Sequence, residues 1–316
     1  MTAETPSPSA SPPEQVRASP PLLRRASAKI TRLSSRLTQK LLLPFARELT
    51  PDRWIFILGC YNSGTSLLAK ILSSHRLIGG LPDEGMYFTD VLPYPEQFGW
   101  PRMWIRCVDK LYLDHATIHD KTVSRIKRQW SLAYPKGSQN LVEKTPSNVL
   151  RMKFLQTHFE PAYFVAVVRN GYAVSEGIRR RAQPGRFGNQ HYKDSYPLEL
   201  CAEQWRASDE VITKERSGLN SFLQVRYEDL TEKPEQVLAQ ITEFLGLDPL
   251  PASILRRAWF VKDRMEPIRN MNAGSLARLS EGEFEIVENI AREPLRKYGY
   301  LRSTANSHSN RGTGLS

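Results

Sequence analysis

Short apolar runs alternate with amphipathic stretches along most of the chain. Continuous apolar runs at Trp54–Leu58 and Tyr163–Val168 predict buried central strands, because a strand covered on both faces carries few polar positions. Shorter strands are predicted at Leu141–Val142 and Phe222–Tyr227. Helices are predicted at Leu67–Leu72, Ser147–Phe159, Ala173–Arg181, Pro197–Arg216, Lys233–Leu245 and Gly282–Tyr298. Strands that alternate with helices predict an α/β fold, a parallel β-sheet with helices on both faces.

Two segments break this alternation and two others flank it. Leu81–Gly137 is rich in proline and aromatic residues, and Gln183–Tyr196 is rich in Gly, Pro, Asn and Gln, so both are predicted to be substrate-facing insertions. We therefore predict one domain over residues 51–302, between a flexible basic tail at residues 1–50 and a disordered tail at residues 303–316.

The predicted N-terminal tail has two parts. Met1–Pro21 is rich in Ser, Pro and Ala, which predicts disorder. Leu22–Phe45 mixes leucines with arginines and lysines, a pattern typical of a basic amphipathic helix. Such a helix could make weak contact with the surface of an anionic membrane. A loosely packed helix or a linker is the favoured alternative, because the apolar stripe is narrow.

Charge and cysteine content narrow the class of protein. The 316 residues carry a formal net charge of +11, which favours an anionic ligand, although eight Lys/Arg against three Glu lie in the first 50 residues. No feature indicates a nucleic-acid partner. Cys60, Cys107 and Cys201 are odd in number and far apart, which is typical of neither a disulfide framework nor a metal cluster. With no apolar run of about 18 residues and no signal-peptide pattern, we expect a cytoplasmic protein.

A glycine-bounded loop, Gly59–Gly64, follows the first predicted strand and precedes a helix. Backbone N–H groups at a helix N-terminus bind phosphate, so this strand–loop–helix unit predicts a P-loop-like phosphate site. Thr65 stands where the Walker A lysine would be, which disfavours ordinary use of ATP or GTP. A plain strand–turn–helix unit is the alternative. Cys60 lies inside the loop and is predicted to be a packing residue rather than a nucleophile.

Three further motifs follow predicted strands. Lys144, in Glu-Lys-Thr-Pro, could face the loop from a neighbouring strand end, and Arg169 directly follows a buried strand and offers a planar fork for a second phosphate. Tyr227 leaves the strand before it and could stack on a base. Each also has an ordinary alternative, a surface ion pair for the cations and a core aromatic for the tyrosine. Because ligands bind at the carboxyl ends of strands in such sheets, their joint occurrence favours one site.

Taken in order, these motifs resemble those of the sulfotransferase family that uses 3′-phosphoadenosine 5′-phosphosulfate (PAPS). The segment LGCYNSGTSLL is similar to that family's 5′-phosphosulfate loop, VAVVRNGYAVSEGIRRR to its 3′-phosphate motif and VRYEDL to its tyrosine motif on the adenine side. The segment IRNMNAGSLARL resembles the C-terminal loop of the tyrosylprotein sulfotransferase branch, and EKTP resembles a motif of heparan-type sulfotransferases. The resemblance covers roughly residues 53–300.

The resemblance implies transfer of a sulfuryl group from PAPS to a hydroxyl or amine, with no metal. It places Lys144 in the active site and Glu84 close to the family's catalytic base, with Asp83 as the competing candidate. A small molecule, a carbohydrate, a lipid and a peptide all remain open as the acceptor, and the oligomeric state is open. The implied donor-binding residues are Asn62, Ser63, Gly64, Thr65, Ser66, Arg169, Ser175, Tyr227 and Arg278.

Two positions depart from the family pattern. Asn62 replaces the usual Lys or Arg before Ser63, so Lys144 is expected to supply the missing charge, or activity is lost. Gly177 stands where a phosphate-binding serine is usual, and Ser175 is the nearest serine. Two other hypotheses remain: a P-loop nucleotide kinase or NTPase, and a non-catalytic relative that binds a nucleotide.

Overall fold

The computed structural model describes residues 41–302 apart from 114–115, 117 and 262–263. The predictions for Met1–Pro21, for most of Leu22–Phe45 and for residues 303–316 lie outside the described residues. The chain divides into two units, Met1–Pro44 and Phe45–Ser316. The second unit therefore begins a few residues before the predicted boundary at residue 51. Within it, the Ala46 carbonyl accepts a hydrogen bond from Nε of Arg128 at 2.9 Å.

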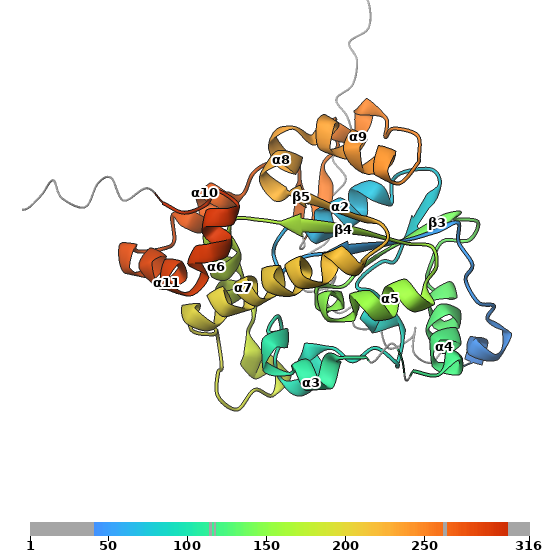
Figure 1. The fold of residues 1–316 in the computed structure, drawn as a ribbon, viewed down its shortest axis with the longest axis horizontal. Coiled ribbons are helices and arrows are strands. Elements are labelled where there is room, and N and C mark those ends of the chain that lie inside the picture. The colour runs from blue at the N-terminus through green and yellow to red at the C-terminus, as the bar shows by residue number, and fades with distance from the viewer. Residues whose placement is uncertain (1–40, 114–115, 117, 262–263, 303–316) are drawn as a thin grey trace, which may run out of the picture. The chain divides into compact units, whose positions relative to one another are not determined.

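A five-stranded parallel sheet is the centre of the second unit (Figure 1). Its order is β2-β3-β1-β4-β5, so the first strand lies in the middle with β3 on one side and β4 on the other. This arrangement confirms the predicted α/β fold. The bounds are β1 Arg53–Leu58, β2 Ile78–Gly80, β3 Asn140–Lys144, β4 Ala162–Val168 and β5 Phe222–Arg226.

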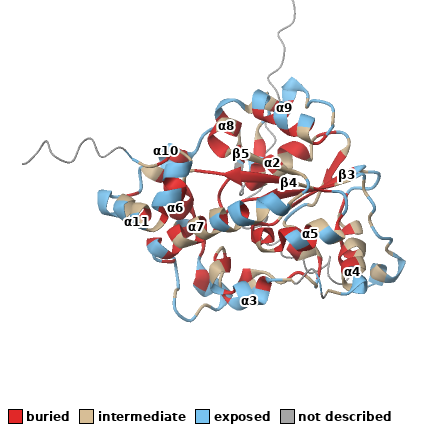
Figure 2. Ribbon diagram, in the orientation of Figure 1, coloured by how far each residue is buried: buried red, intermediate tan, exposed pale blue. Residues whose placement is uncertain are grey.

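Helices cover both faces of this sheet, because successive side chains of a buried strand point to opposite faces. Trp54, Phe56 and Leu58 of β1 pack in one hydrophobic core, whereas Ile55 and Ile57 pack in the other. Figure 2 shows the strands as buried and the outer faces of the helices as exposed. The first core includes α4 Asp120–Ser131, α5 Met152–His158, α6 Gly171–Arg181, α7 Leu198–Glu215 and α11 Glu281–Lys297. The second includes α2 Thr65–Leu72, α8 Tyr227–Glu232 and α9 Pro234–Phe244.

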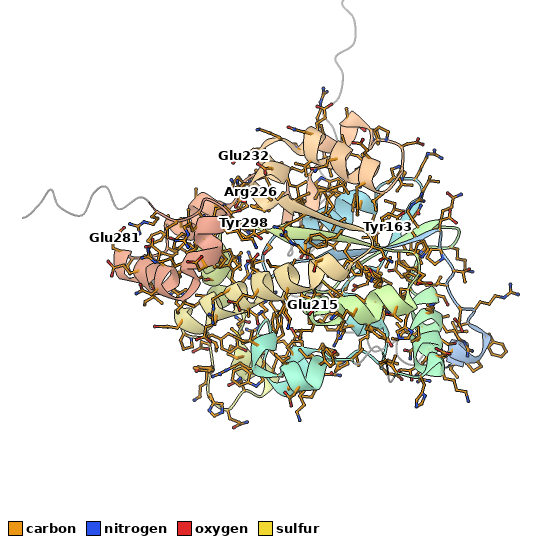
Figure 3. The ribbon with its side chains drawn as sticks, viewed as in Figure 1. Tyr163, Glu215, Arg226, Glu232, Glu281 and Tyr298 are labelled. Carbon is orange, nitrogen blue, oxygen red and sulfur yellow. The ribbon has the colours of Figure 1, made fainter. Side chains whose placement is uncertain are left out.

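Tyr298, which follows α11 and is labelled in Figure 3, connects this last helix to the rest of the unit. Its hydroxyl donates to Asp209 on α7 and accepts a hydrogen bond from the side chain of Gln224 on β5 at 2.8 Å. The C-terminal helix is thereby fixed against the layer that also contains α6.

Several elements differ from the sequence prediction. The strand β2 was missed because three residues, Ile-Gly-Gly, are too few to show a period. The expected insertion Leu81–Gly137 contains the twelve-residue helix α4, whose buried positions Val123, Ile126 and Trp130 have helical spacing. Tyr227 begins α8 instead of ending the strand. Other short elements are η2 Gly85–Phe88, η3 Pro95–Phe98, η4 Trp104–Arg106, α3 Val108–Leu111, η5 Pro146–Arg151, the hairpin β6 Trp259–Val261 with β7 Arg264–Glu266, and α10 Asn272–Leu276.

None of the helices in the described part of the chain combines the length and the apolar character needed to cross a membrane.

Candidate functional site

The carboxyl ends of four strands meet at one edge of the sheet, as the sequence predicted. The loop 59–64 follows β1, Lys144 ends β3, Arg169 follows β4 and Tyr227 follows β5. In the register of the sheet, Ile57 of β1 lies opposite Lys144 on one side and Val165 on the other. Strands β2 and β3 lie on one side of β1, and β4 and β5 lie on the other, and open α/β sheets bind ligands at the carboxyl edge where the strand order reverses in this way.

A cavity of about 480 Å³ opens at this edge. Nine of the eleven predicted site residues line it: Asn62, Gly64, Thr65, Ser66, Glu84, Lys144, Arg169, Tyr227 and Arg278. Eight of its lining residues are Lys or Arg, and three are Asp or Glu. An excess of cations in a concave site favours a ligand with several negative charges.

The phosphate loop is held by close packing around Gly64. This residue has φ of 96°, and a Cβ there would lie 2.5 Å from the ring of Tyr227. Both the backbone conformation and the space therefore require glycine. The helix α2 begins at the next residue, so its N-terminal N–H groups lie at the cavity beside Thr65 and Ser66.

Arg169 lies beneath the cavity and is held by neutral groups. Its Nε donates to Oδ1 of Asn272 at 2.8 Å, and one terminal nitrogen donates to the Asn62 carbonyl at 2.7 Å. Burial lowers the pKa of Arg169 from 12.5, but a guanidinium remains protonated in proteins. Asn272 also donates to Glu228, so the Glu228 carboxylate contacts this amide and not the guanidinium. A charge held this way is available to an anion.

Tyr227 packs as a buried aromatic residue, which is the ordinary alternative that the sequence left open. The residue is only 4% exposed, and the guanidinium of Arg169 lies 4.2 Å from the centre of its ring. Its hydroxyl donates to the Arg269 carbonyl and accepts from the Met271 amide, at 3.1 and 3.2 Å. Tyr227 therefore connects the loop, Arg169 and the segment before α10, while stacking on a base stays a prediction.

Lys144 and Glu84, the two predicted catalytic residues, form an ion pair. Nζ of Lys144 lies 2.6 Å from Oε1 of Glu84, and the two side chains are 11% and 17% exposed. The competing base candidate, Asp83, is exposed, and its carboxylate accepts the backbone N–H of Glu84 at 2.9 Å. The structure therefore pairs Glu84 with Lys144, the other predicted catalytic residue. It gives Asp83 a hydrogen bond to the backbone of the turn.

Glu143 fixes the backbone next to Glu84, a role that was not predicted from the sequence. Its carboxyl accepts the Gly85 amide at 2.8 Å and Nδ2 of Asn148 at 2.6 Å. Trp130 donates to the Gly85 carbonyl at 2.9 Å, so both backbone groups of the residue after Glu84 are fixed. Burial raises the pKa of the Glu143 carboxyl to about 7. A glutamate inside the short apolar strand Asn140–Lys144 was the available signal.

Two predicted residues do not reach the cavity. The Ser63 side chain is buried and lines a separate internal space of about 20 Å³ behind the loop, together with Cys60 and Trp205. Ser175 is fully buried, and its hydroxyl donates to the Gly171 carbonyl at 2.8 Å. Neither side chain therefore lines the cavity, contrary to what the prediction of donor-binding side chains required. The position named from the family pattern, Gly177, does line the cavity.

Five of the lining cations were not predicted: Lys70, Arg102, Arg180, Arg181 and Arg269. Arg180 and Arg181 lie one turn after Gly177 on α6, and this spacing could have identified them. Arg102 comes from the irregular segment Leu81–Gly137, where no sequence period places a side chain. Cys60 is confirmed as a packing residue, because it is buried and burial raises the pKa of its thiol to about 12.

Fold and site together define an α/β protein with a cationic cavity at the carboxyl edge of a parallel sheet. A model described as "Sulfotransferase family" matches residues 54–251. The chain belongs to the sulfotransferase family, which confirms the resemblance found in its motifs.

Individual relatives are distant. Protein-tyrosine sulfotransferase 2 of Gallus gallus is 24% identical over 254 residues, which are 77% of this chain and 62% of that protein. Omega-hydroxy-beta-dihydromenaquinone-9 sulfotransferase Stf3 of Mycobacterium bovis is 25% identical over 197 residues, covering 59% of this chain and 47% of that one. The chain thus spans less than two thirds of the length of these curated relatives. A solved sulfotransferase domain from the curacin biosynthetic pathway aligns with TM-score 0.47 and 20% identity, covering 79% of this chain and 98% of that domain.

Proposed function

We propose that the protein transfers a sulfuryl group from PAPS to a hydroxyl group of an acceptor molecule. The observation that carries this proposal is the cavity, which a phosphate loop and seven other cations line together with a glutamate–lysine pair. Family membership supports the same chemistry. A nucleotide with phosphates at both its 3′ and 5′ positions and a sulfuryl group fits an excess of cations spread along the cavity.

The residues fit the donor in two groups. The loop 62–66 and the start of α2 would bind the 5′ end, because backbone N–H groups there favour an anion. Arg169 and Arg278 would bind the side that carries the 3′-phosphate, as Arg169 is held by neutral partners and Arg278 is exposed at the cavity. Gly64 supports this fit, since any larger residue would displace Tyr227 from below Arg169.

The chemistry is a displacement at sulfur. The acceptor oxygen forms a bond to sulfur, and the bond between sulfur and the bridging oxygen of the phosphate breaks. The bonding pair stays on that oxygen and leaves with 3′,5′-adenosine bisphosphate (PAP). Glu84 accepts the proton of the acceptor hydroxyl, and cations near the leaving oxygen stabilise the charge that develops there. Lys144 is the cation closest to Glu84 and serves this second role.

The acceptor follows only in outline from the relatives. The chicken relative is named for protein tyrosine and the mycobacterial relative for an ω-hydroxy lipid. Both of these molecules carry a hydroxyl group. A hydroxyl needs a general base, and Glu84 at the cavity provides one. We therefore propose a hydroxyl acceptor that reaches the cavity beside Glu84.

Titration calorimetry with PAPS, PAP and ATP plus Mg²⁺ tests the proposal against its two alternatives. The proposed function predicts binding of PAPS and PAP, and turnover of ³⁵S-labelled PAPS with an extract of the source organism. A nucleotide kinase or NTPase would bind ATP with Mg²⁺ and release phosphate. A non-catalytic relative would bind PAPS without labelling any product. Failure to bind PAPS and PAP would overturn the proposal.

A further inference from the structure

The pairing of Lys144 with Glu84 creates an electrostatic problem for the proposed function, on which this inference rests. An ion pair has no net charge, so this pair alone offers little attraction to the negative oxygens of a transferring sulfuryl group. Arg169 keeps its charge, but two hydrogen bonds hold its guanidinium beside Tyr227, where the proposed function assigns it to the 3′-phosphate side of the donor. A cation without such a partner, close to Glu84, would resolve the problem.

Arg102 has these properties. It lines the same cavity as Tyr61, Asn62 and Glu84. In the described part of the chain its side chain has no hydrogen bond and no ion pair within 4 Å. Lys70 is the other lining cation without such a bond, but its Nζ lies 5.7 Å from the centre of the Phe260 ring, on the side of Asp83. Among the lining cations that the structure describes, Arg102 is therefore the one with no side-chain hydrogen bond, ion pair or ring contact.

The backbone at Arg102 is unusual and firmly supported. Its φ is 60°, a left-handed conformation that arginine rarely adopts. The flanking residues Pro101 and Met103 are buried, and the Met103 amide donates to the Trp100 carbonyl at 3.1 Å. Such a conformation persists only where the surroundings enforce it, and it is common at functional sites. Asn62, which also lines the cavity, has a positive φ as well, of 66°.

Glu96 connects Arg102 to the rest of the site. The charge of Arg102 lies close enough to the Glu96 carboxyl to lower its pKa, without an ion pair within 4 Å among the described residues, and the electrostatic neighbours of Glu96 also include Glu84 and Tyr61. One oxygen of Glu96 and the Tyr61 hydroxyl are buried without a hydrogen-bond partner among the described residues. Arg102 thus lies near Glu96, whose electrostatic neighbours include Glu84.

We propose that Arg102 binds the sulfuryl group of the donor and supplies the positive charge that the Lys144–Glu84 pair cancels. Its planar fork suits two oxygens of one tetrahedral group. The contact exists only with PAPS, because PAP lacks the sulfuryl group. Arg102 is therefore a specificity-determining residue for the sulfated form of the donor, supplied by the insertion and not by a strand end.

The test compares calorimetric affinities for PAPS and PAP in the wild type and in Arg102→Ala. Loss of one charge-assisted contact should weaken PAPS binding about 10- to 100-fold. PAP binding should change less than about twofold, which also shows that the variant is folded. Arg106→Ala is the matched control, because Arg106 is exposed on the same segment and lies against Trp100, outside this cavity. It should leave both affinities unchanged.

Arg102→Lys keeps the charge without the fork and should recover part of the preference for PAPS. Equal losses for PAPS and PAP in Arg102→Ala would show a nucleotide contact and overturn the inference, as would no change for either. Those outcomes leave the proposed function intact. If the wild type binds neither ligand, the proposed function fails, and the inference fails with it.

Discussion

Arg169 and Lys144 occupy corresponding places, at the ends of the two strands that flank β1, yet they are held in opposite ways. Arg169 binds an amide oxygen and a backbone carbonyl, whereas Lys144 binds a carboxylate at 2.6 Å. A cation held by neutral groups keeps its charge for a ligand, and a paired cation does not. The Arg169 side of the cavity is therefore organised for an anion in advance. On the other side, Lys144 and Glu84 must separate before either group acts.

Loss of the Glu84 carboxylate should cause the largest fall in turnover. It should also distinguish the Lys144–Glu84 side of the cavity from the Arg169 side most clearly. Glu84→Gln keeps the shape but removes the proposed base, so we expect turnover to fall about 10²–10⁴-fold. Because Lys144 loses its partner, donor affinity should stay equal or rise. Single-turnover rates with the acceptor found by labelling, together with calorimetry of PAP, measure both quantities.

Asp83→Asn is the matched control for this change, since Asp83 precedes Glu84 and lines the same cavity. Its carboxylate contacts the Glu84 backbone, so only a small loss of rate is expected. Near-wild-type turnover in Glu84→Gln with a large loss in Asp83→Asn would make Asp83 the base.

Gly64→Ala tests whether the Arg169 side is organised in advance. A Cβ at Gly64 would lie 2.5 Å from the Tyr227 ring, which supports the Arg169 guanidinium. We expect a lower melting temperature and about tenfold or greater loss of PAP affinity, comparable with loss of one charge-assisted contact. Gly137→Ala is the control, because Gly137 also has a positive φ, of 78°, but has no atom within 4 Å of the added Cβ.

Gly137→Ala should show only the backbone strain, about 1–2 kcal/mol of stability, without any change in PAP affinity. Equal stability and equal affinity in the two variants would show that the contact between Gly64 and Tyr227 does not organise the site.

Glu96→Gln should have the smallest effect, visible in the pH dependence of stability. Burial, and then the neighbouring Glu84, raise the pKa of Glu96 from 4.5 to about 7. Between these values the folded wild type binds more protons than the unfolded chain, so its stability falls as pH rises. Glutamine cannot ionise, so the Glu96→Gln variant does not lose this stability as pH rises. The groups around Glu96 are Tyr61, Glu84, Arg102, Cys107 and Tyr196.

Melting temperatures at pH 5 and pH 8 measure this effect. The value for Glu96→Gln minus that of the wild type should increase with pH, by roughly 2–4 °C for each 1 kcal/mol. Glu235→Gln, a change at an exposed site on α9, controls for the loss of a charge. A difference that is constant or decreases with pH would contradict the assignment.

The residues at strand ends and those in the insertion also differ in how far the sequence predicts them. Gly64, Lys144, Arg169 and the parallel sheet follow from short-range patterns, because a residue that follows a buried strand must lie at the carboxyl edge. Ser63 and Ser175 lie on the correct segments, but their side chains turn inward through packing that a linear motif does not specify.

The cavity residues that the insertion Leu81–Gly137 contributes could largely not be predicted, for a different physical reason. Arg102 lies in a turn and Glu96 in the short 3₁₀ helix η3, and in such short elements the direction of each side chain depends on tertiary contacts and not on a period of 2 or 3.6. Glu84 was found only through the family resemblance, and its pairing with Lys144 joins residues 60 positions apart.

On the proposed function, Arg169 offers its charge to the donor, whereas Lys144 does not until Glu84 releases it. Calorimetric affinities of PAP and adenosine 5′-phosphate for the wild type, Arg169→Ala and Lys144→Ala test this most directly. We predict that Arg169→Ala weakens PAP binding about 10- to 100-fold and weakens adenosine 5′-phosphate, which lacks the 3′-phosphate, far less. Lys144→Ala should reduce both affinities only modestly. Equal losses for both ligands in Arg169→Ala, or a larger loss of PAP affinity in Lys144→Ala, would contradict the account.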